Sequence, residues 1–204
     1  MFKNKINTWY NKYCKSCSQI SDIKIVIEKA VKLSYKSSVL RALYYNNKQV
    51  GFDGKKKESF IARKNCEIYL KNLLSDLYRF NNMKGQKVIG MFESVWCKIR
   101  REYHSVGIIW YTYGNAQKWT AMAVKYFYII AYKNKLLCLK SHLLDSVLPI
   151  DRKIMKAVKL DFNVSELQPT WSNCDDSSTI IKYLEDVKSK LNKKRILQYE
   201  IEKW

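Results

Sequence analysis

Residues 113–118, Tyr113-Gly114-Asn115-Ala116-Gln117-Lys118, and residues 148–151, Leu148-Pro149-Ile150-Asp151, decide how this chain is interpreted. The first stretch places a glycine turn before an apolar helix expected over 116–132. The second places a proline, which fixes the backbone, and then an aspartate at the start of another helix. We therefore expect Lys118 and Asp151 to lie at the mouths of two neighbouring helices.

Helical periodicity continues on both sides of these stretches, and breaks are few because the chain has only 2 prolines and 6 glycines. Further helices are predicted over residues 23–34, 37–44, 58–80, 88–103, 136–144, 151–158 and 175–194. Residues 1–20 fit an arm or an irregular first helix, and residues 106–112 fit either a buried strand or a short helix. The predicted fold class is all-α with little or no sheet, in one domain over 1–204 that divides at most into two lobes, about 1–105 and 106–204.

The charge of the chain points to a polyanionic partner. It has 38 Lys+Arg against 18 Asp+Glu, a formal net charge of +20, while 47% apolar residues suffice for a core. Self-repulsion on this scale is typical of nucleic-acid-binding proteins, with an anionic membrane surface or codon bias as alternatives. The sequence has neither a spanning apolar stretch nor a secretory signal, so we expect a cytoplasmic protein without membrane contact.

The sequence predicts neither a metal site nor a cofactor. Cys14 and Cys17 have the spacing of metal ligands, but a zinc site needs two further ligands and no second pair follows. His104 and His142 lack a matching acid or cysteine pattern. The carboxylates in Asp175-Asp176 are expected to cap the helix over 175–194, and no nucleotide-binding glycine motif is present.

Each of the two opening stretches also has an ordinary structural interpretation. Gly114 fits a helix connection as well as a phosphate site built from the free amide groups of a helix start. Lys118 taken alone is a solvated lysine, and Asp151 taken alone is a helix cap.

Taken together, the two stretches resemble the helix-hairpin-helix DNA glycosylase superfamily. Its members share a glycine hairpin, a following lysine, an apolar helix and a Val-Pro-Val-Asp-like segment that carries the catalytic aspartate. Here the hairpin would span 106–132, and the separation between Lys118 and Asp151 is most similar to the archaeal GO glycosylase branch, which acts on 8-oxoguanine. The likeness covers about residues 106–160; the usual second glycine of the hairpin is missing, and a C-terminal four-cysteine cluster is absent.

The resemblance implies an architecture and a set of residue roles. A cleft between two helical lobes would receive a base flipped out of double-stranded DNA. Lys118 would attack the sugar and form a Schiff base, and Asp151 would accept a proton and stabilise positive charge on the sugar. The expected DNA-binding residues are Gly114, Asn115, Gln117, Lys125, Arg152 and Lys153, and the expected base-stacking residues are Trp171 and Trp204.

Several functions stay open at this point. The leading expectation is a monomeric DNA glycosylase/AP lyase that acts on double-stranded DNA containing a modified base, 8-oxoguanine or a similar one. A hypermodified phage base, excised in antiviral defence, is an alternative substrate. A non-catalytic nucleic-acid-binding protein and a structural protein with incidental charge are rivals from other classes.

Overall fold

The structure is a computed structural model that describes residues 2–39, 56–79, 85–137, 143, 147–191 and 195–203. The described part contains eight α-helices and no β-strand, so the predicted all-α class is confirmed. The helices are α1 (Phe2–Trp9), α2 (Ile23–Ser34), α4 (Lys56–Arg79), α5 (Gly85–Ser105), α6 (Tyr113–Lys133), α7 (Arg152–Phe162), α8 (Ser177–Lys190) and α9 (Ile196–Lys203).

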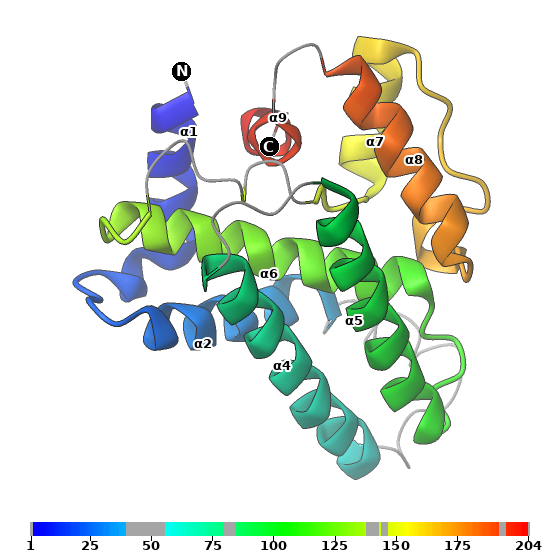
Figure 1. Cartoon of the computed structure of the whole chain (residues 1–204), viewed down its shortest axis with the longest axis horizontal. Coiled ribbons are helices and arrows are strands. Elements are labelled where there is room, and N and C mark those ends of the chain that lie inside the picture. The colour runs from blue at the N-terminus through cyan, green and yellow to red at the C-terminus, as the bar shows by residue number, and fades with distance from the viewer. Residues whose placement is uncertain are drawn as a thin grey trace.

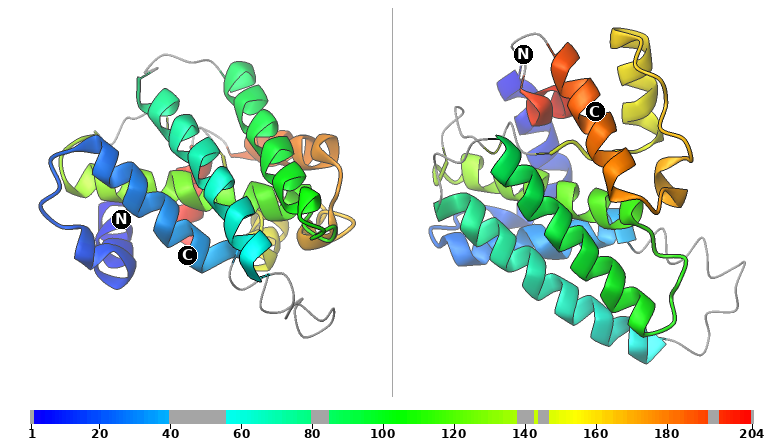
Figure 2. Two further views of the ribbon diagram at one scale, coloured as in Figure 1. Left: turned by 90° about the horizontal axis from the view of Figure 1, so that it is seen from below. Right: turned by 45° about the vertical axis from the view of Figure 1, so that its right-hand side comes forward.

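Helix α6 is the central element of the fold. In Figure 1 it crosses the middle of the molecule, with α2 and α4 below it, α1, α9, α7 and α8 above it, and α5 running across it. Figure 2 shows the same arrangement from two other directions, with α4 and α5 side by side. Other helices cover α6 on all sides, so nearly every one of its residues is buried. Apolar side chains all round the helix make this burial favourable.

The buried side chains of the described residues form one hydrophobic core. It runs from Ile6 on α1 to Ile201 on α9 and includes Trp119 and Phe127 of α6. Helices α5 and α6, which lie on either side of residue 105 in the sequence, pack against each other. The division into two lobes stays a prediction.

The N-terminal segment forms an irregular helix, which was one of the two structures expected for residues 1–20; the other was an arm. Helix α1 passes into a π-helical turn at Tyr10–Cys14 and then a 3-10 turn at Lys15–Cys17. The thiols of Cys14 and Cys17 are both buried, and burial raises the pKa of Cys14 to about 12. At neutral pH Cys14 is therefore an uncharged thiol packed in the core.

Other boundaries differ from the sequence predictions. Residues 106–112 form turns and extended backbone, neither strand nor helix, and α6 begins at Tyr113 behind an N-cap at Thr112. The predicted helix at 37–44 is replaced at its start by a π-helical turn, Tyr35–Val39, and its remainder lies outside the described residues. The same is true of most of 136–144. Helix α9 was not predicted, although it supplies buried side chains to the core.

The described helices include none long and apolar enough to cross a bilayer. Within the described residues, histidine, cysteine and acidic side chains do not gather in groups of three or more that could hold a metal ion.

Candidate functional site

Folding brings the side chains of Lys118 and Asp151 together, as the sequence predicted. The Nζ of Lys118 lies 3.6 Å from Oδ2 of Asp151, and the two side chains are 19% and 9% exposed. Lys118 lies in the second turn of α6, whereas Asp151 precedes the first turn of α7. The pair is therefore shielded from bulk water but still open to solvent at its edge.

Asp151 has two roles at once. It is the N-cap of α7, and its Oδ1 accepts a hydrogen bond of 3.0 Å from the backbone N–H of Ile154. Its other carboxylate oxygen, Oδ2, faces Lys118. The capping bond and the positive end of the helix dipole fix the orientation of this carboxylate.

Trp171 completes the arrangement around the lysine. Its indole ring lies 4.4 Å from the Nζ of Lys118, within the range of a cation–π contact. Trp171 begins a short 3-10 turn, Trp171–Asn173, that packs against the start of α6. The expected base-stacking role of Trp171 stays a prediction; that of Trp204 falls on a residue outside the described ones.

The start of α6 does not present free amide groups to a phosphate. Its first three N–H groups already have acceptors within the protein, so the prediction that Gly114 and Asn115 cradle a DNA phosphate is wrong. The bonds run from Tyr113 N to Asp175 Oδ1 at 3.3 Å, from Gly114 N to Cys174 O at 3.0 Å and from Asn115 N to Thr112 Oγ1 at 3.3 Å. The Asn115 side chain is also buried and donates to Thr112 Oγ1 and Ser172 O.

Gly114 has a different reason to be glycine from the one expected. It lies inside the first turn of α6, and a Cβ placed on it would come within 1.5 Å of the carbonyl oxygen of Trp171. The absence of a side chain therefore lets the Trp171–Asn173 turn approach the helix. That close approach places the Trp171 ring beside Lys118.

Gln117 is also a correction to the predicted DNA contacts. Its side chain is fully buried, so it cannot reach a base edge or a phosphate. Instead its Nε2 donates to the carbonyl of Leu148 at 2.5 Å, and its Oε1 accepts from the N–H of Ile150 at 3.1 Å. These two bonds hold the backbone on both sides of Pro149, directly before Asp151.

Lys125 is likewise buried and was wrongly assigned to the DNA surface. Its Nζ lies 2.5 Å from Oε1 of Glu200 on α9 and 3.3 Å from the ring centre of Trp9. Burial lowers the pKa of Lys125 to about 8 and raises that of Glu200, whose Oε2 has no hydrogen-bond partner among the described residues. The pair joins α1, α6 and α9 in the core.

Arg152 and Lys153, the other two expected DNA-binding residues, lie at the surface. Both are exposed in the first turn of α7, directly after Asp151. Their contact with DNA stays a prediction.

Three pockets among the described residues lie away from the lysine–aspartate pair. They have volumes of about 510, 350 and 170 Å³, and none of these three is lined by Lys118 or Asp151. The cleft expected at the lysine–aspartate pair therefore stays a prediction.

Sequence reasoning missed the residues that position the pair. Gln117 lies among apolar residues on a helix that is buried on every face. A single amide side chain in such an apolar stretch was the one sequence signal that could have indicated a buried hydrogen-bonding role. Asp175 accepts from Tyr113 N and forms a two-bonded ion pair with Arg100 of α5, which raises the pKa of that guanidinium. No local pattern pointed to that contact, because 75 residues separate the two partners.

No protein-family model, curated protein or solved structure significantly matches this chain.

Proposed function

We propose that this chain is a DNA glycosylase with AP lyase activity, with Lys118 as the nucleophile and Asp151 as its proton acceptor. The observation that carries the proposal is the 3.6 Å approach of the Lys118 ammonium to a carboxylate, from positions 33 residues apart (151 − 118), at a partly exposed site. The resemblance of the two motifs to helix-hairpin-helix glycosylases supports the same assignment.

The proposed chemistry begins with a proton transfer. Asp151 takes a proton from the Lys118 ammonium, and the free amine attacks C1′ of the target nucleotide. The C1′–N bond breaks, and the base leaves with its electron pair and is then protonated. The nitrogen bonded to C1′ then carries two protons: one passes to O4′ as the C1′–O4′ bond breaks, and the other stays on the nitrogen, which gives the protonated Schiff base.

Strand cleavage follows from the Schiff base. Loss of a proton from C2′ expels the phosphate from C3′, and water then releases the lysine. In the proposed mechanism Asp151 passes the proton it took from Lys118 to the departing base, and its carboxylate then stabilises the positive charge of the sugar-derived Schiff base. A base must leave the duplex to reach this pair, and the exposed Arg152 and Lys153 lie beside it to contact phosphates.

Covalent trapping with borohydride tests the proposal. The full chain is incubated with duplexes that contain 8-oxoguanine and with DNA from phages that carry hypermodified bases, and released bases are scored in parallel. Trapping on one substrate class is expected, and it identifies the substrate. Lys118→Arg keeps the cation beside Trp171 but removes the nucleophilic amine, so it should abolish trapping; trapping that survives this change would contradict the proposal.

A second function is favoured by one observation. The contacts of Lys118 with Asp151 and Trp171 can also serve a purely structural role, which suits a nucleic-acid-binding protein without catalysis. Such a protein would bind DNA with steep salt dependence and release no base from any substrate, and the substitution Asp151→Asn would leave its behaviour unchanged.

A further inference from the structure

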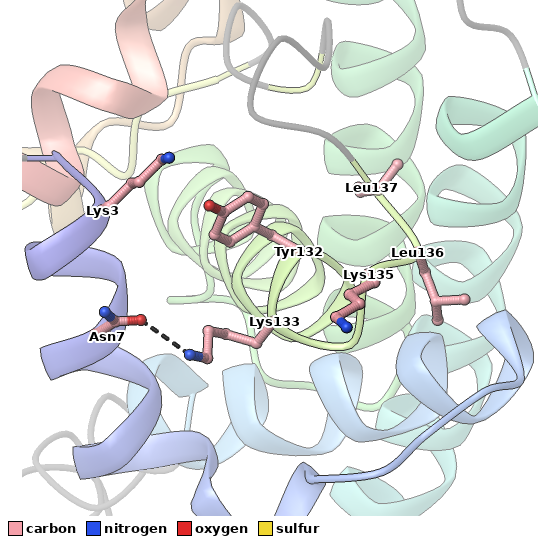
Figure 3. A pocket seen from close by; sticks show the side chains of 7 residues that line it. All are labelled: Lys3, Asn7, Tyr132, Lys133, Lys135, Leu136 and Leu137. Atoms are coloured by element: carbon pink, nitrogen blue, oxygen red, sulfur yellow. Dashed lines mark hydrogen bonds between the residues drawn. The ribbon is translucent and has the colours of Figure 1, made fainter.

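Helix α1 is flanked by a lysine-lined groove on each side. The first groove, of about 510 Å³, lies between α1 and the C-terminal end of α6 and is lined by Lys3, Lys133 and Lys135 together with Asn7, Tyr132 and two leucines. Figure 3 shows Lys3 and Tyr132 pointing toward each other across this groove. Lys133 donates a 2.9 Å hydrogen bond to Asn7, which holds its ammonium at the groove wall.

The second groove lies between α1 with its π-helical turn and the start of α7. It measures about 170 Å³ and is lined by Lys5, Lys12 and Lys153 together with Thr8, Trp9 and Tyr13. Tyr13 is 37% exposed, and its ring lies 4.6 Å from that of Trp9. Each groove therefore combines three lysines with a tyrosine: Tyr13 is exposed, whereas Tyr132 is partly buried, with its ring stacked on that of Tyr128 at 6.1 Å.

The absence of acidic groups distinguishes these two grooves from the third pocket. Among the described residues, no aspartate or glutamate lines either of them. The pocket of about 350 Å³ near α8 is different, because Lys182 and Lys190 there are balanced by Glu166 and Asp186. The sequence agrees, since residues 2–21 contain four lysines and no acidic residue. The described residues that line each groove thus include three lysines and no carboxylate, an excess of positive charge that attracts phosphates.

The packing of α1 argues for a dissolved polyanion and against a bilayer. A helix that inserts into a membrane surface needs an exposed apolar face. Here the apolar residues Ile6 and Trp9 are buried in the core. Lysines and tyrosines are left at the surface.

The tyrosines further select the form of nucleic acid. Aromatic rings bind bases by stacking, and stacking requires bases that are not already paired in a duplex. Lysines on a groove wall beside a stacking ring are typical of proteins that bind single strands.

We propose that α1 and its two grooves bind single-stranded nucleic acid, with phosphates held by the six lysines and bases stacked on Tyr132 and Tyr13. The first groove lies far from the lysine–aspartate pair, since the 15 residues from Lys118 to Lys133 span about 22 Å of helix. The proposal rests on the proposed function only in its class of partner, and it adds a strand-binding surface that acts without base excision.

Fluorescence anisotropy with the full chain tests this surface. The probes are an unmodified oligothymidylate of about 20 nucleotides and a duplex of the same length. This length exceeds the number of nucleotides that one small single-strand-binding domain contacts. The groove variant carries Lys3→Gln, Lys12→Gln and Lys135→Gln. The matched control carries Lys182→Gln, Lys188→Gln and Lys190→Gln on α8, all exposed, so both variants lose the same charge.

The single strand should bind more tightly than the duplex. A plot of the logarithm of the binding constant against the logarithm of salt concentration has a negative slope. The groove variant should make this slope shallower by about 2, because three phosphate contacts are lost, whereas the control should keep the wild-type slope. Tyr13→Ala should weaken single-strand binding about five-fold or more, and Tyr13→Phe, which keeps the ring, should not.

Three results would overturn the proposal: equal losses in the groove variant and the control, tighter binding of the duplex, or binding of phosphatidylserine vesicles in place of the oligonucleotide. Because the probes contain no modified base, these results are independent of covalent trapping at Lys118. Thermal unfolding of each variant checks that the fold is kept.

Discussion

The side chain of Gln117 accepts a 3.1 Å hydrogen bond from the backbone N–H of Ile150, and this bond fixes the segment that carries Asp151 against α6. The same side chain donates to Leu148. Gln117 and Lys118 are adjacent in sequence, so one turn of α6 supplies both the proposed nucleophile and the group that positions its carboxylate. Gln117 is thus a positioning residue.

Replacing Gln117 by Met, which has a similar volume, should leave two buried backbone groups without partners. We expect the free energy of unfolding to fall by about 1–3 kcal/mol per group, and Asp151 to lose its fixed position. Denaturant unfolding and the rate of covalent trapping measure the two effects. The exposed Gln168 provides the control, since Gln168→Met should change neither quantity.

Asp151→Asn should separate catalysis from stability. Asparagine caps helices as well as aspartate does, so the free energy of unfolding should change little, within about 0.5 kcal/mol. Loss of the proton acceptor should slow base release by about 10²–10⁴. Asp176, the N-cap of α8, offers the matched comparison, and Asp176→Asn should leave base release intact. Equal rates in the two variants would make Asp151 a cap and nothing more.

Gly114→Ala should push the Trp171–Asn173 turn away from α6. The added methyl group would overlap the Trp171 carbonyl, at a cost of about 1–3 kcal/mol in the free energy of unfolding, and would displace the ring from Lys118. Gly90→Ala on α5 is the control: nothing lies within 4 Å of its Cβ, so better helix propensity should raise stability by about 1 kcal/mol. Thermal melts of both variants decide the matter, and a neutral Gly114→Ala would refute the close approach.

The buried Lys125–Glu200 pair should be costly to break and cheap to replace. Lys125→Met alone leaves the Glu200 carboxyl buried without its cation and should destabilise the fold by about 3–5 kcal/mol. The double variant Lys125→Met/Glu200→Leu should recover most of that loss, since apolar residues of similar volume often substitute for a buried pair. Denaturant unfolding of the single and double variants measures this; additive losses would contradict it.

The same pair should give the fold a distinct response to pH. Burial lowers the pKa of Lys125 from 10.5 to about 8, so between these values the unfolded chain binds the proton that the folded chain has released. The contribution of this group to the free energy of unfolding therefore rises with pH across the window. The free energy of unfolding of the wild type minus that of the Lys125→Met/Glu200→Leu variant, measured from pH 8 to 10, cancels the contributions of other groups. This difference should rise with pH, and a fall would contradict the prediction.

The fold class and the Lys118–Asp151 pair could be predicted because short stretches of the sequence contain the signals for both. Apolar spacing located α2, α4, α5 and α6, and a proline followed by an aspartate located the start of α7. The errors at Gly114, Asn115, Gln117 and Lys125 have a common cause: apolar spacing indicated one buried face for α6, whereas neighbours cover the whole helix. A lysine can be buried there only because Glu200, 75 residues away, supplies the opposite charge, and no local pattern indicates such a partner.

The central place of α6 also limits how far the protein can be trimmed. A fragment that starts near residue 106 would keep Lys118, Asp151 and Trp171, yet it would lose α1, α2, α4 and α5, and the apolar side chains that these helices cover would meet water. We expect such a piece to aggregate during expression. A minimal active unit for biochemical work therefore has to retain the helices before residue 106, although none of them contributes a side chain to the lysine–aspartate pair.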